Sequence, residues 1–213
     1  MYIEKSLMQY ALDTRSSDPT PGGGSVSAYV ATLGSALTSM VGGLTFGKKS
    51  FQEVPEKTRE EMETKAQELE KLFDELAEIV DRDTTAFDKV MAAFKLPKDT
   101  EEEKKTRSKA IQEGYREALE VPLGCAKKCH RVLELQGVFA ENGNVNAITD
   151  IGVGILLVHS GLEGALLNVT INLGSIKDEN YREEVSAQVT QLLSTGKILK
   201  EQGMEMVYRR LEG

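Results

Sequence analysis

The chain has 213 residues, a formal net charge of −8 and only two cysteines. This acidic balance argues against nucleic acid as the main partner, because binding phosphates requires a basic surface. The five prolines, with no Pro/Ser/Gly-rich linker between periodic segments, predict a single domain over residues 1–213. Acids near the start in place of a long apolar signal segment, together with the low cysteine content, make the cytoplasm the expected compartment.

Hydrophobic residues recur with a period near 3.6 throughout the chain, and no strong segment alternates as a strand would. A short amphipathic helix is expected over Ile3–Thr14, and a second helix opens at Gly22–Ser25 and reaches about Thr45. Small residues share one face of this second helix at 4-3 spacing, so another backbone can approach it closely. They are Gly24, Ala28, Ala31, Ser35, Thr38 and Gly42.

Two longer helices are expected in the middle of the chain. Pro55 is well placed to begin the first, which Leu96–Pro97 ends. Thr100 and Glu103 have the spacing of a capping box at the start of the second. We expect this helix to kink at Pro122, because proline cannot donate to the helical ladder of hydrogen bonds.

The turn Asn142–Asn144 leads into an apolar helix over Val145–Ile176, and Asp178 could cap a last helix ending near Arg210. This apolar segment and Val26–Leu44 are long enough to be mistaken for membrane spans, but both contain polar side chains, which argues against insertion. We therefore expect an all-α, up-and-down bundle of long helices with no membrane segment. Elongated bundles tend to bury an apolar face against a copy of themselves, so a homodimer is expected.

One acid interrupts an apolar seam in the long helix that begins near Pro55. Residues recur there at the 4-3 spacing of a stripe that faces a partner helix. Asp83 is the only ionisable group on this seam, and a carboxylate there is costly unless it is paired, hydrogen-bonded or protonated. Natural chains tend to break such rules at functional sites, so Asp83 is the first candidate for chemistry. The seam comprises Met62, Ala66, Leu69, Phe73, Leu76, Val80, Asp83, Phe87, Val90 and Phe94.

A narrow stripe of polar residues and glycines follows one face of the apolar helix. The glycines alone favour close packing of another helix, whereas the polar side chains require hydrogen-bonding partners. Asp150 and Asn168 are about 27 Å apart along the axis at 1.5 Å per residue. Either the ligand is long, or the two ends serve different sites, which a dimer could join. The stripe contains Asn146, Asp150, Gly154, Leu157, Gly161, Gly164, Asn168 and Asn172.

The segment Pro19–Ser25 lies directly before the second helix and contains three consecutive glycines. Free backbone N–H groups at a helix start attract anions and polarised carbonyls, and glycine lets a ligand approach them. The segment lacks the Lys-Ser/Thr of a P-loop and follows no strand, so neither nucleotide motif is matched. Taken alone, it is typical of a plain helix start. Lys48 and Lys49 follow the same helix and could bind carboxylates or complement its dipole.

No metal site is predicted from the cysteines and histidines. Cys125 and Cys129 lie one helical turn apart beside His130, but a zinc site normally has four ligands and no second cluster is present. We expect buried thiols without a chemical role, and we expect His159 to be a hydrogen-bonded core residue. A Ser-His-Asp arrangement lacks the G-x-S-x-G elbow that would support it.

Four ordered segments closely resemble one protein family. They are PTPGGGSVSAYVATLGSAL, VDRDTTAFDKVMAAFKLPK, EEKKTRSKAIQEGYREALEVPL and NVNAITDIGVGILLVHSGLEGALLNVTINL. They cover nearly the whole chain and are similar to the cyclodeaminase domain of formiminotransferase-cyclodeaminase and its free-standing bacterial relatives, including methenyltetrahydrofolate cyclohydrolases. The resemblance implies an all-α fold, dimers of long helices and a tetrahydrofolate substrate near the glycine segment. Formimino transfer from formiminoglutamate is not expected, because the sequence does not contain the transferase half.

The same resemblance implies roles for individual residues. It makes Asp83, the second acid of the D-x-D-x-x-A-F run, the catalytic residue, in agreement with the seam argument. Together with the glycine segment and the lysine pair, it predicts a set of substrate-binding residues. They are Pro21, Gly22, Gly23, Gly24, Ser25, Lys49, Asn144, Asn146, Asp150, Asn168 and Asn172.

The implied reaction closes a ring on 5-formiminotetrahydrofolate: N10 attacks the amidine carbon on N5, ammonia leaves, and 5,10-methenyltetrahydrofolate forms. N10 loses a proton and the departing amine gains one, so a single carboxyl with a raised pKa can act first as base and then as acid. Neither this reaction nor its first alternative, methenyltetrahydrofolate cyclohydrolase, needs a metal or redox cofactor. The second alternative is a non-catalytic folate-binding bundle in which Asp83 fixes helix register.

Overall fold

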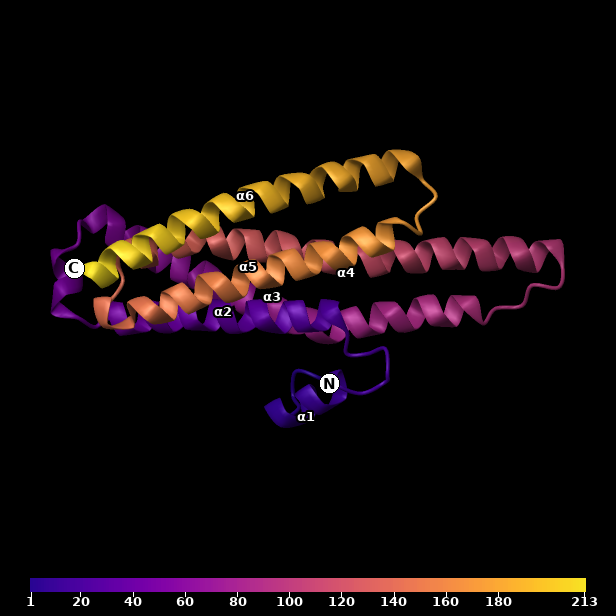
Figure 1. Ribbon diagram of the computed structural model, residues 1–213, viewed down its shortest axis with the longest axis horizontal. Coiled ribbons are helices and arrows are strands. Elements are labelled where there is room, and N and C mark those ends of the chain that lie inside the picture. Colours follow the sequence, from indigo (N-terminus) through magenta and orange to yellow (C-terminus); the bar gives the residue numbers. More distant parts are fainter.

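Six α-helices and two short 3-10 helices follow one another along residues 1–213, all of which this computed structural model describes (Figure 1). No strand is present, so the all-α prediction is confirmed. The α-helices are α1 (Leu7–Thr14), α2 (Gly23–Phe46), α3 (Glu56–Phe94), α4 (Glu101–Asn142), α5 (Ile148–Leu173) and α6 (Glu179–Glu212). The 3-10 helices are η1 (Lys49–Glu53), which the sequence did not predict, and η2 (Val145–Ala147).

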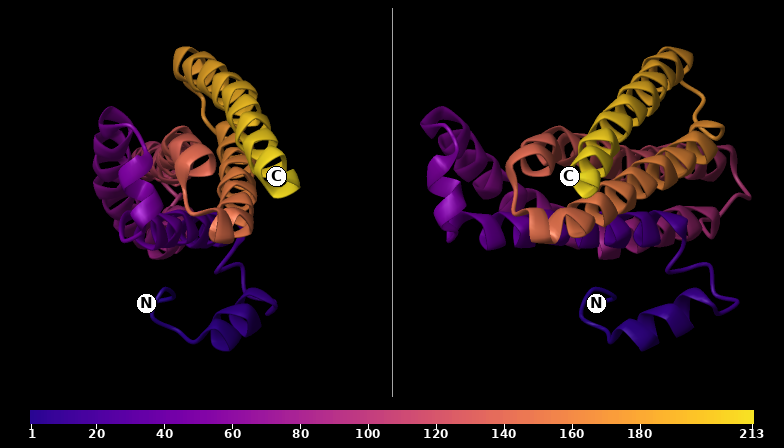
Figure 2. Two further views of the ribbon diagram at one scale, coloured as in Figure 1. Left: turned by 90° about the vertical axis from the view of Figure 1, so that its left-hand side faces the viewer. Right: turned by 60° about the vertical axis from the view of Figure 1, so that its left-hand side comes forward.

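The five long helices, α2 to α6, run in alternating directions and form an elongated up-and-down bundle (Figure 1). α5 packs against α2, α4 and α6, while α3 packs against α2 and α4. Figure 2 shows that α6 diverges from the other helices towards its N-terminal end and that α1 lies beside the bundle. This topology brings the start of α2, the second half of α3 and the end of α5 into one region.

Small residues bring the backbones of α2 and α5 into direct contact. A Cβ atom at Gly34 would lie 2.7 Å from the carbonyl oxygen of Gly154, and one at Gly161 would lie 2.8 Å from the carbonyl oxygen of Ser27. At Gly164 it would lie 2.3 Å from the Oγ of Ser27. The glycines of α5 therefore serve close packing, as the sequence predicted.

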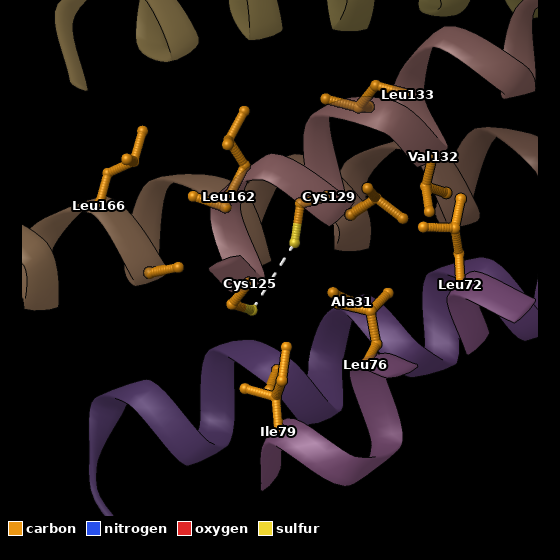
Figure 3. Packing of buried hydrophobic residues seen from close by; sticks show 14 of the residues in the cluster. Ala31, Leu72, Leu76, Ile79, Cys125, Cys129, Val132, Leu133, Leu162 and Leu166 are labelled. Carbon is orange, nitrogen blue, oxygen red and sulfur yellow. Dashed lines mark hydrogen bonds between the residues drawn. The ribbon is translucent and has the colours of Figure 1, made fainter. Parts of the chain in front are cut away.

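The core between α3, α4 and α5 is built mainly from leucine, isoleucine and valine side chains (Figure 3). Cys125 and Cys129 lie within it as free thiols, with their Sγ atoms 4.0 Å apart. The hydrogen bond with Cys125, together with burial, raises the pKa of the Cys129 thiol, which therefore stays protonated at neutral pH. No group of three or more His, Cys, Asp or Glu side chains is arranged to hold a metal ion.

Polar caps set the start of two helices as the sequence predicted. Thr100 and Glu103 form a capping box on α4: the Glu103 N–H donates to the Thr100 hydroxyl at 3.1 Å, and the Thr100 N–H donates to the Glu103 carboxylate at 2.9 Å. Asp178 caps α6 by accepting from the N–H of Tyr181 at 3.1 Å. Such caps satisfy backbone donors that a helix start leaves free.

The buried stripe of α3 departs from the predicted seam in the second half of the helix. Leu76 is fully buried as predicted, but Phe87 and Phe94 are 36% and 41% exposed, so their assignment to the buried seam is wrong. The alanine before each phenylalanine takes the buried place. α3 and α4 approach closely here, since a Cβ atom at Gly114 would lie 3.3 Å from the Cα of Val90.

α4 continues as a helix through Pro122. Proline has no N–H to donate to the carbonyl four residues earlier, which belongs to Ala118. The Nδ2 of Asn172, on α5, donates to that carbonyl oxygen at 2.8 Å. A side chain of the neighbouring helix thus satisfies the group that the proline leaves free, while the expected kink stays a prediction.

By length and composition alone, α2 and the segment Val145–Leu173 could each cross a membrane. In the bundle they pack against each other and against further helices, and about half of each apolar stretch is buried, 44% and 50% respectively. That environment is the one expected for the central helices of a bundle. Several of their other apolar side chains are exposed.

Candidate active site

A pocket with a volume of about 400 Å³ lies between the start of α2, the second half of α3, the first half of α4 and the end of α5. Its wall combines the glycine segment before α2, four apolar side chains of α3 and two asparagines of α5. Asp83 is the only charged side chain in this lining. We call this region of the molecule the Asp83 end.

The carboxyl of Asp83 lies directly against the first turn of α2. A Cβ atom at Gly24 would lie 2.2 Å from its Oδ1 and 2.6 Å from its Oδ2, so only glycine leaves room for the carboxyl. Burial raises the pKa of Asp83 above its ordinary value of 3.8. The backbone N–H of Ser25 donates to the carboxyl and acts in the opposite direction, because it favours the charged form. The result is an acid that holds its proton more tightly than an exposed aspartate.

The hydroxyl of Ser25 is used within the protein. Its Oγ donates to the carbonyl oxygen of Val80 at 2.8 Å. The O–H of Tyr10 must therefore be the donor in its 2.9 Å contact with the same Oγ. This chain of hydrogen bonds joins α1, α2 and α3 beside Asp83. Of the polar groups of Ser25, the backbone N–H is the one that reaches the acid.

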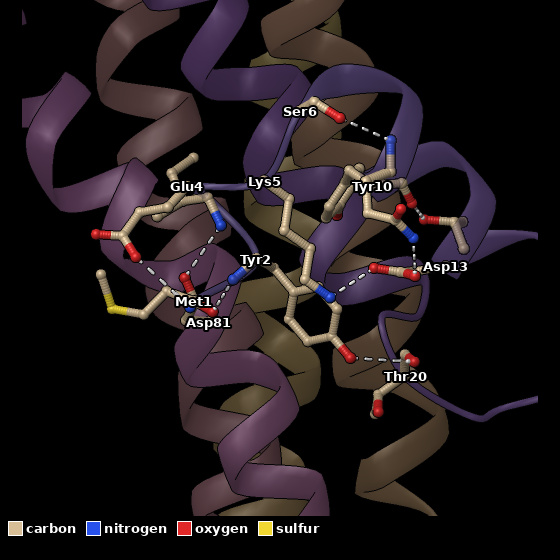
Figure 4. Close-up of polar contacts among 12 residues, drawn as sticks. Met1, Tyr2, Glu4, Lys5, Ser6, Tyr10, Asp13, Thr20 and Asp81 are labelled. Atoms are coloured by element: carbon tan, nitrogen blue, oxygen red, sulfur yellow. Dashed lines mark hydrogen bonds and ion pairs between the residues drawn. The ribbon is translucent and has the colours of Figure 1, made fainter.

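Asp81 and Asp83 are two residues apart on α3 and lie in different surroundings. Asp81 accepts hydrogen bonds from the backbone N–H groups of Tyr2 at 2.5 Å and Ile3 at 3.3 Å (Figure 4). These bonds hold the first residues outside a helix, so α1 begins at Leu7 and the predicted start at Ile3 is wrong. Side chains two positions apart on a helix point about 200° apart, and only the second acid reaches the pocket.

Asn168 and Asn172 line the pocket one helical turn apart on α5. The Nδ2 of Asn168 donates to the carbonyl oxygen of Gly164 at 2.8 Å, and the Nδ2 of Asn172 donates to that of Ala118 at 2.8 Å. Because both partners are carbonyl oxygens, only the NH₂ side of each amide can face them. Each asparagine therefore keeps its Oδ1 as an acceptor for another group.

The other predicted substrate-binding residues lie at the opposite end of the α2–α5 pair, which we call the Asn144 end. Lys49 begins η1 and Asn146 belongs to η2, and both are exposed. Asp150 lies in the first turn of α5, about 27 Å along the helix axis from Asn168. Within one chain, the predicted residues therefore form two groups that do not meet.

At the Asn144 end, the polar atoms of Asn144 bond to other parts of the chain. Its backbone N–H donates to the Thr45 hydroxyl at 2.8 Å, and its Nδ2 donates to the carbonyl oxygen of Leu44 at 3.2 Å. Its Oδ1 accepts from the N–H of Asn146 at 3.1 Å. Asn144 thus caps η2 and ties it to the end of α2.

Sequence reasoning missed most of the apolar wall of the pocket. Phe87 and Phe94 were assigned to the buried seam, and Tyr115 of α4, which packs edge-on against Phe94 at 6.2 Å between ring centroids, was not singled out. Ile171 lines the same pocket and is 75% exposed. Of these four residues, Phe87 is the one whose sequence position places it beside Asp83, because it follows Asp83 by one helical turn on the same face.

Three comparisons relate the chain to known proteins. Residues 6–191 match the family model described as formiminotransferase-cyclodeaminase. The chain is 41% identical over 192 residues to a methenyltetrahydrofolate cyclohydrolase from Methylorubrum extorquens, covering 90% of each protein. It is 37% identical over 210 residues to the formimidoyltransferase-cyclodeaminase of Gallus gallus, covering 99% of this chain and 37% of that protein. A solved structure, the formiminotetrahydrofolate cyclodeaminase from Thermotoga maritima, is similar with a TM-score of 0.78 and 29% identity, covering 99% of this chain and 97% of that one.

Proposed function

The chain belongs to the formiminotransferase-cyclodeaminase family, and we propose that it is a tetrahydrofolate enzyme that converts 5-formiminotetrahydrofolate to 5,10-methenyltetrahydrofolate and ammonia. The family match over residues 6–191 confirms the resemblance seen in the sequence. The observation that carries the proposed mechanism is Asp83, a half-buried acid with a raised pKa and the only charged side chain lining the pocket.

In the proposed reaction Asp83 acts first as a base. The substrate carries a protonated formimino group on N5, and N10 attacks its carbon to close a five-membered ring. N10 then loses its proton to the Asp83 carboxylate, which leaves a neutral aminal with an amino group on the bridging carbon. Burial raises the pKa of Asp83 and so makes its carboxylate a stronger base than an exposed one.

Asp83 then acts as an acid. It gives the proton to the amino group, the C–N bond breaks, and ammonia leaves with the electron pair of that bond. The methenyl product carries the single positive charge that the formimino group carried before, so protons and charge balance. The Asp83 carboxylate that remains stabilises this cation in a pocket whose α3 wall is apolar.

The proposed chemistry requires neither a redox cofactor nor a metal. The formimino, methenyl and formyl carbons are all at the oxidation level of formate, so no electrons are exchanged. The positive charge of the substrate already polarises the carbon that is attacked, and Asp83 supplies both proton transfers. We therefore propose that the folate is the sole organic ligand of the reaction.

Methenyltetrahydrofolate cyclohydrolase is the second candidate activity. The 41% identity to a protein of that name, over 90% of both chains, favours it. In this reaction Asp83 would take a proton from a water molecule that attacks the methenyl carbon. It would return that proton to N5 as the bond between N5 and the carbon breaks, while the hydroxyl proton is lost to solvent and 10-formyltetrahydrofolate forms.

One experiment separates the two activities. The methenyl chromophore is followed over time with the wild-type protein, starting in one cuvette from 5-formiminotetrahydrofolate and in another from 5,10-methenyltetrahydrofolate. A rise in the first with ammonia release supports cyclodeaminase, and a fall in the second alone supports cyclohydrolase. If neither rate exceeds the uncatalysed one, both proposed activities are wrong and the non-catalytic folate-binding bundle becomes the better interpretation.

We further propose a cytoplasmic homodimer that covers the outward faces of α2 and α5. On α2 the side chains of Leu33, Met40 and Leu44 are 41–45% exposed and follow the heptad spacing of a helix–helix seam. On α5, Leu167 and Ile171 are 71% and 75% exposed. Exposed apolar side chains of this kind on two helices that pack together fit a second copy of the same surface.

The dimer proposal is tested by light scattering after size-exclusion chromatography. Wild type is expected at twice the chain mass, and the double variant Leu33→Lys, Met40→Lys at the chain mass. Ile198→Lys, on the exposed surface of α6 (52% exposed), is the matched control and should remain dimeric. A monomeric wild type would overturn the proposal, and binding of that monomer to lipid vesicles would assign the stripes to a membrane instead.

A dimer would also give the Asn144 end a way to reach the substrate. Lys49, Asn146 and Asp150 lie at the opposite end of the α2–α5 pair from a folate held at Asp83 in the same chain, but they could reach it from the second copy. Mixing two inactive variants, Asp83→Asn and Lys49→Ala, would then restore part of the activity in mixed dimers. A Lys49→Ala variant with full activity would instead remove Lys49 from the set of substrate-binding residues.

A further inference from the structure

We propose that Pro122 is a positioning residue for folate recognition. Its missing N–H leaves the Ala118 carbonyl free to anchor Asn172, so that Asn168 and Asn172 present two oriented acceptor oxygens to the N–H donors of the pterin ring. The inference rests on the proposed folate function and adds to it the part of the substrate that the end of α5 recognises.

Pro122 occupies an unfavourable position for a proline. It is buried within α4, at a position where proline is the least favourable residue because it cannot donate and its ring crowds the carbonyl four residues earlier. Local propensity therefore does not explain it. Residues that break a local rule in this way are found at functional or strained sites.

The carbonyl that Pro122 leaves free is bonded by α5. Ala118 lines the pocket, and its carbonyl oxygen accepts the Nδ2 of Asn172 at 2.8 Å. With any other residue at position 122, a backbone N–H would point along the helix at the same oxygen. Pro122 removes this backbone donor, and the Asn172 amide takes its place as the partner of the carbonyl.

A second contact between the same two segments keeps the end of α5 in place. The Nε2 of Gln112, on α4, donates to the carbonyl oxygen of Ser175 at 3.0 Å, and its Oε1 accepts the backbone N–H of Lys177 at 2.9 Å. The turn after α5 is therefore fixed on α4 at two levels, by Gln112 and by the Ala118–Asn172 bond. An asparagine held in this way loses little further freedom when a ligand binds.

The two asparagines offer acceptor oxygens to a ligand. Each NH₂ group donates one of its two hydrogens to a carbonyl oxygen, while the Oδ1 of Asn168 and of Asn172 accepts no hydrogen bond within the chain. Two acceptors one helical turn apart require a ligand edge that carries donors. The tetrahydropterin ring has such donors at its 2-amino group, N3 and N8, whereas the carboxylates of the glutamate tail are themselves acceptors. The two Oδ1 acceptors therefore match the ring better than the tail.

The test measures binding and turnover in Pro122→Ala, Asn172→Ala and the double variant. Binding is followed by calorimetry with 5-formyltetrahydrofolate, and turnover with the substrate that the wild type uses. Pro97→Ala, which changes an exposed proline after the end of α3, is the control. Because alanine is favourable inside a helix, Pro122→Ala is expected to fold and to unfold at the same or a higher temperature than the wild type.

We expect Asn172→Ala to weaken binding about tenfold, the loss typical of one hydrogen bond. Pro122→Ala should raise Kd and KM several-fold while kcat stays within about twofold, the pattern of lost ground-state binding. In the Asn172→Ala background, Pro122→Ala should have no further effect on Kd, because it acts only through Asn172. Replacing the 2-amino group of the ligand by methyl should weaken binding to the wild type more than binding to either variant.

The proposal is overturned if Pro122→Ala binds the folate as tightly as the wild type, or if the two substitutions weaken binding additively. Were Pro122→Ala poorly folded, Asn172→Asp would still test the anchor, because a carboxylate cannot donate to the Ala118 carbonyl; unchanged binding in that variant would contradict the proposal. A wild type that neither binds nor converts any reduced folate would instead refute the proposed function, and the inference would fall with it.

Discussion

The two ends of the α2–α5 pair carry similar-looking polar residues in the sequence but differ in how the structure uses them. At the Asn144 end the side chain of Asn144 caps η2 and bonds to α2, so its polar groups are satisfied by the fold. At the Asp83 end the half-buried acid packs against Gly24, and two asparagine oxygens are left without a partner in the chain. Unused hydrogen-bonding capacity and a raised pKa, rather than polarity as such, distinguish a site for chemistry from a structural cap.

Replacing the acid at the Asp83 end should have the largest effect. Asp83→Asn keeps the size of the side chain but removes the proton carrier, so we expect kcat to fall by about 10²–10⁴, the usual contribution of a general acid–base. The matched control is Asp81→Asn, two residues away, which should keep kcat because Asp81 holds only the N-terminal segment. Equal losses in both variants, measured by the methenyl chromophore, would show that the fold and not the chemistry was affected.

Glycines at the two ends should respond in opposite directions. In Gly24→Ala the new Cβ would lie 2.2 Å from the Asp83 carboxyl, and we expect kcat to fall by about tenfold or more because a small displacement of a catalytic group is costly. Gly43→Ala, near the Asn144 end, meets no atom within 4 Å and should raise the free energy of unfolding by about 0.5–1 kcal/mol. Chemical denaturation and steady-state kinetics on both variants check this contrast; full activity in Gly24→Ala would contradict the contact with Asp83.

Removing the cap at the Asn144 end should affect stability rather than turnover. Asn144→Ala loses the cap of η2 and the bond to the Leu44 carbonyl, and we expect unfolding to become easier by about 1 kcal/mol. Turnover at low temperature should be unchanged if Asn144 serves only the fold. A loss of turnover with unchanged stability would place Asn144 in the substrate site of a dimer instead.

The smallest expected effect is a pH-dependent gain in stability when the acid is removed. Burial raises the pKa of Asp83 above 3.8, so the folded state binds this proton more tightly than the unfolded state. The resulting stability is present below pH 3.8 and is lost as the pH rises through the raised pKa. Asp83→Asn should therefore be more stable than wild type at neutral pH, and the difference should vanish in acid. Thermal unfolding across this pH range tests the sign, and a variant less stable than wild type at pH 7 would contradict it.

Some features of the fold and of the site could be predicted from the sequence. Asp83 stands out from the spacing of one helix, because an acid on an apolar seam is visible without knowing what the seam contacts. The capping box on α4 and the close packing of the α5 glycines were also predictable, since both depend on residues near in sequence or on one helical face.

The rest of the site depends on how helices are brought together. Tyr115 and Ala118 reach the pocket only because α4 packs against both α3 and α5, and no local pattern in their sequence indicates this. The same holds for Asn144 and Asn168: both are asparagines predicted to bind substrate, and only their partners in the folded chain separate a cap from a pocket residue. Phe87 and Phe94 fit the seam spacing but were displaced by smaller neighbours where α3 and α4 approach closely.

The most direct test of the account is a titration of the Asp83 carboxyl itself. Carbon-13 detection of the side-chain carboxyl signals, with Asp83→Asn to identify the resonance, reports its protonation between pH 2 and pH 8. We predict a midpoint above 3.8, with the fall of turnover in acid following the same midpoint. A carboxyl that titrates at or below 3.8, or a turnover that is indifferent to its protonation, would contradict the assignment of Asp83 as the group that carries the proton.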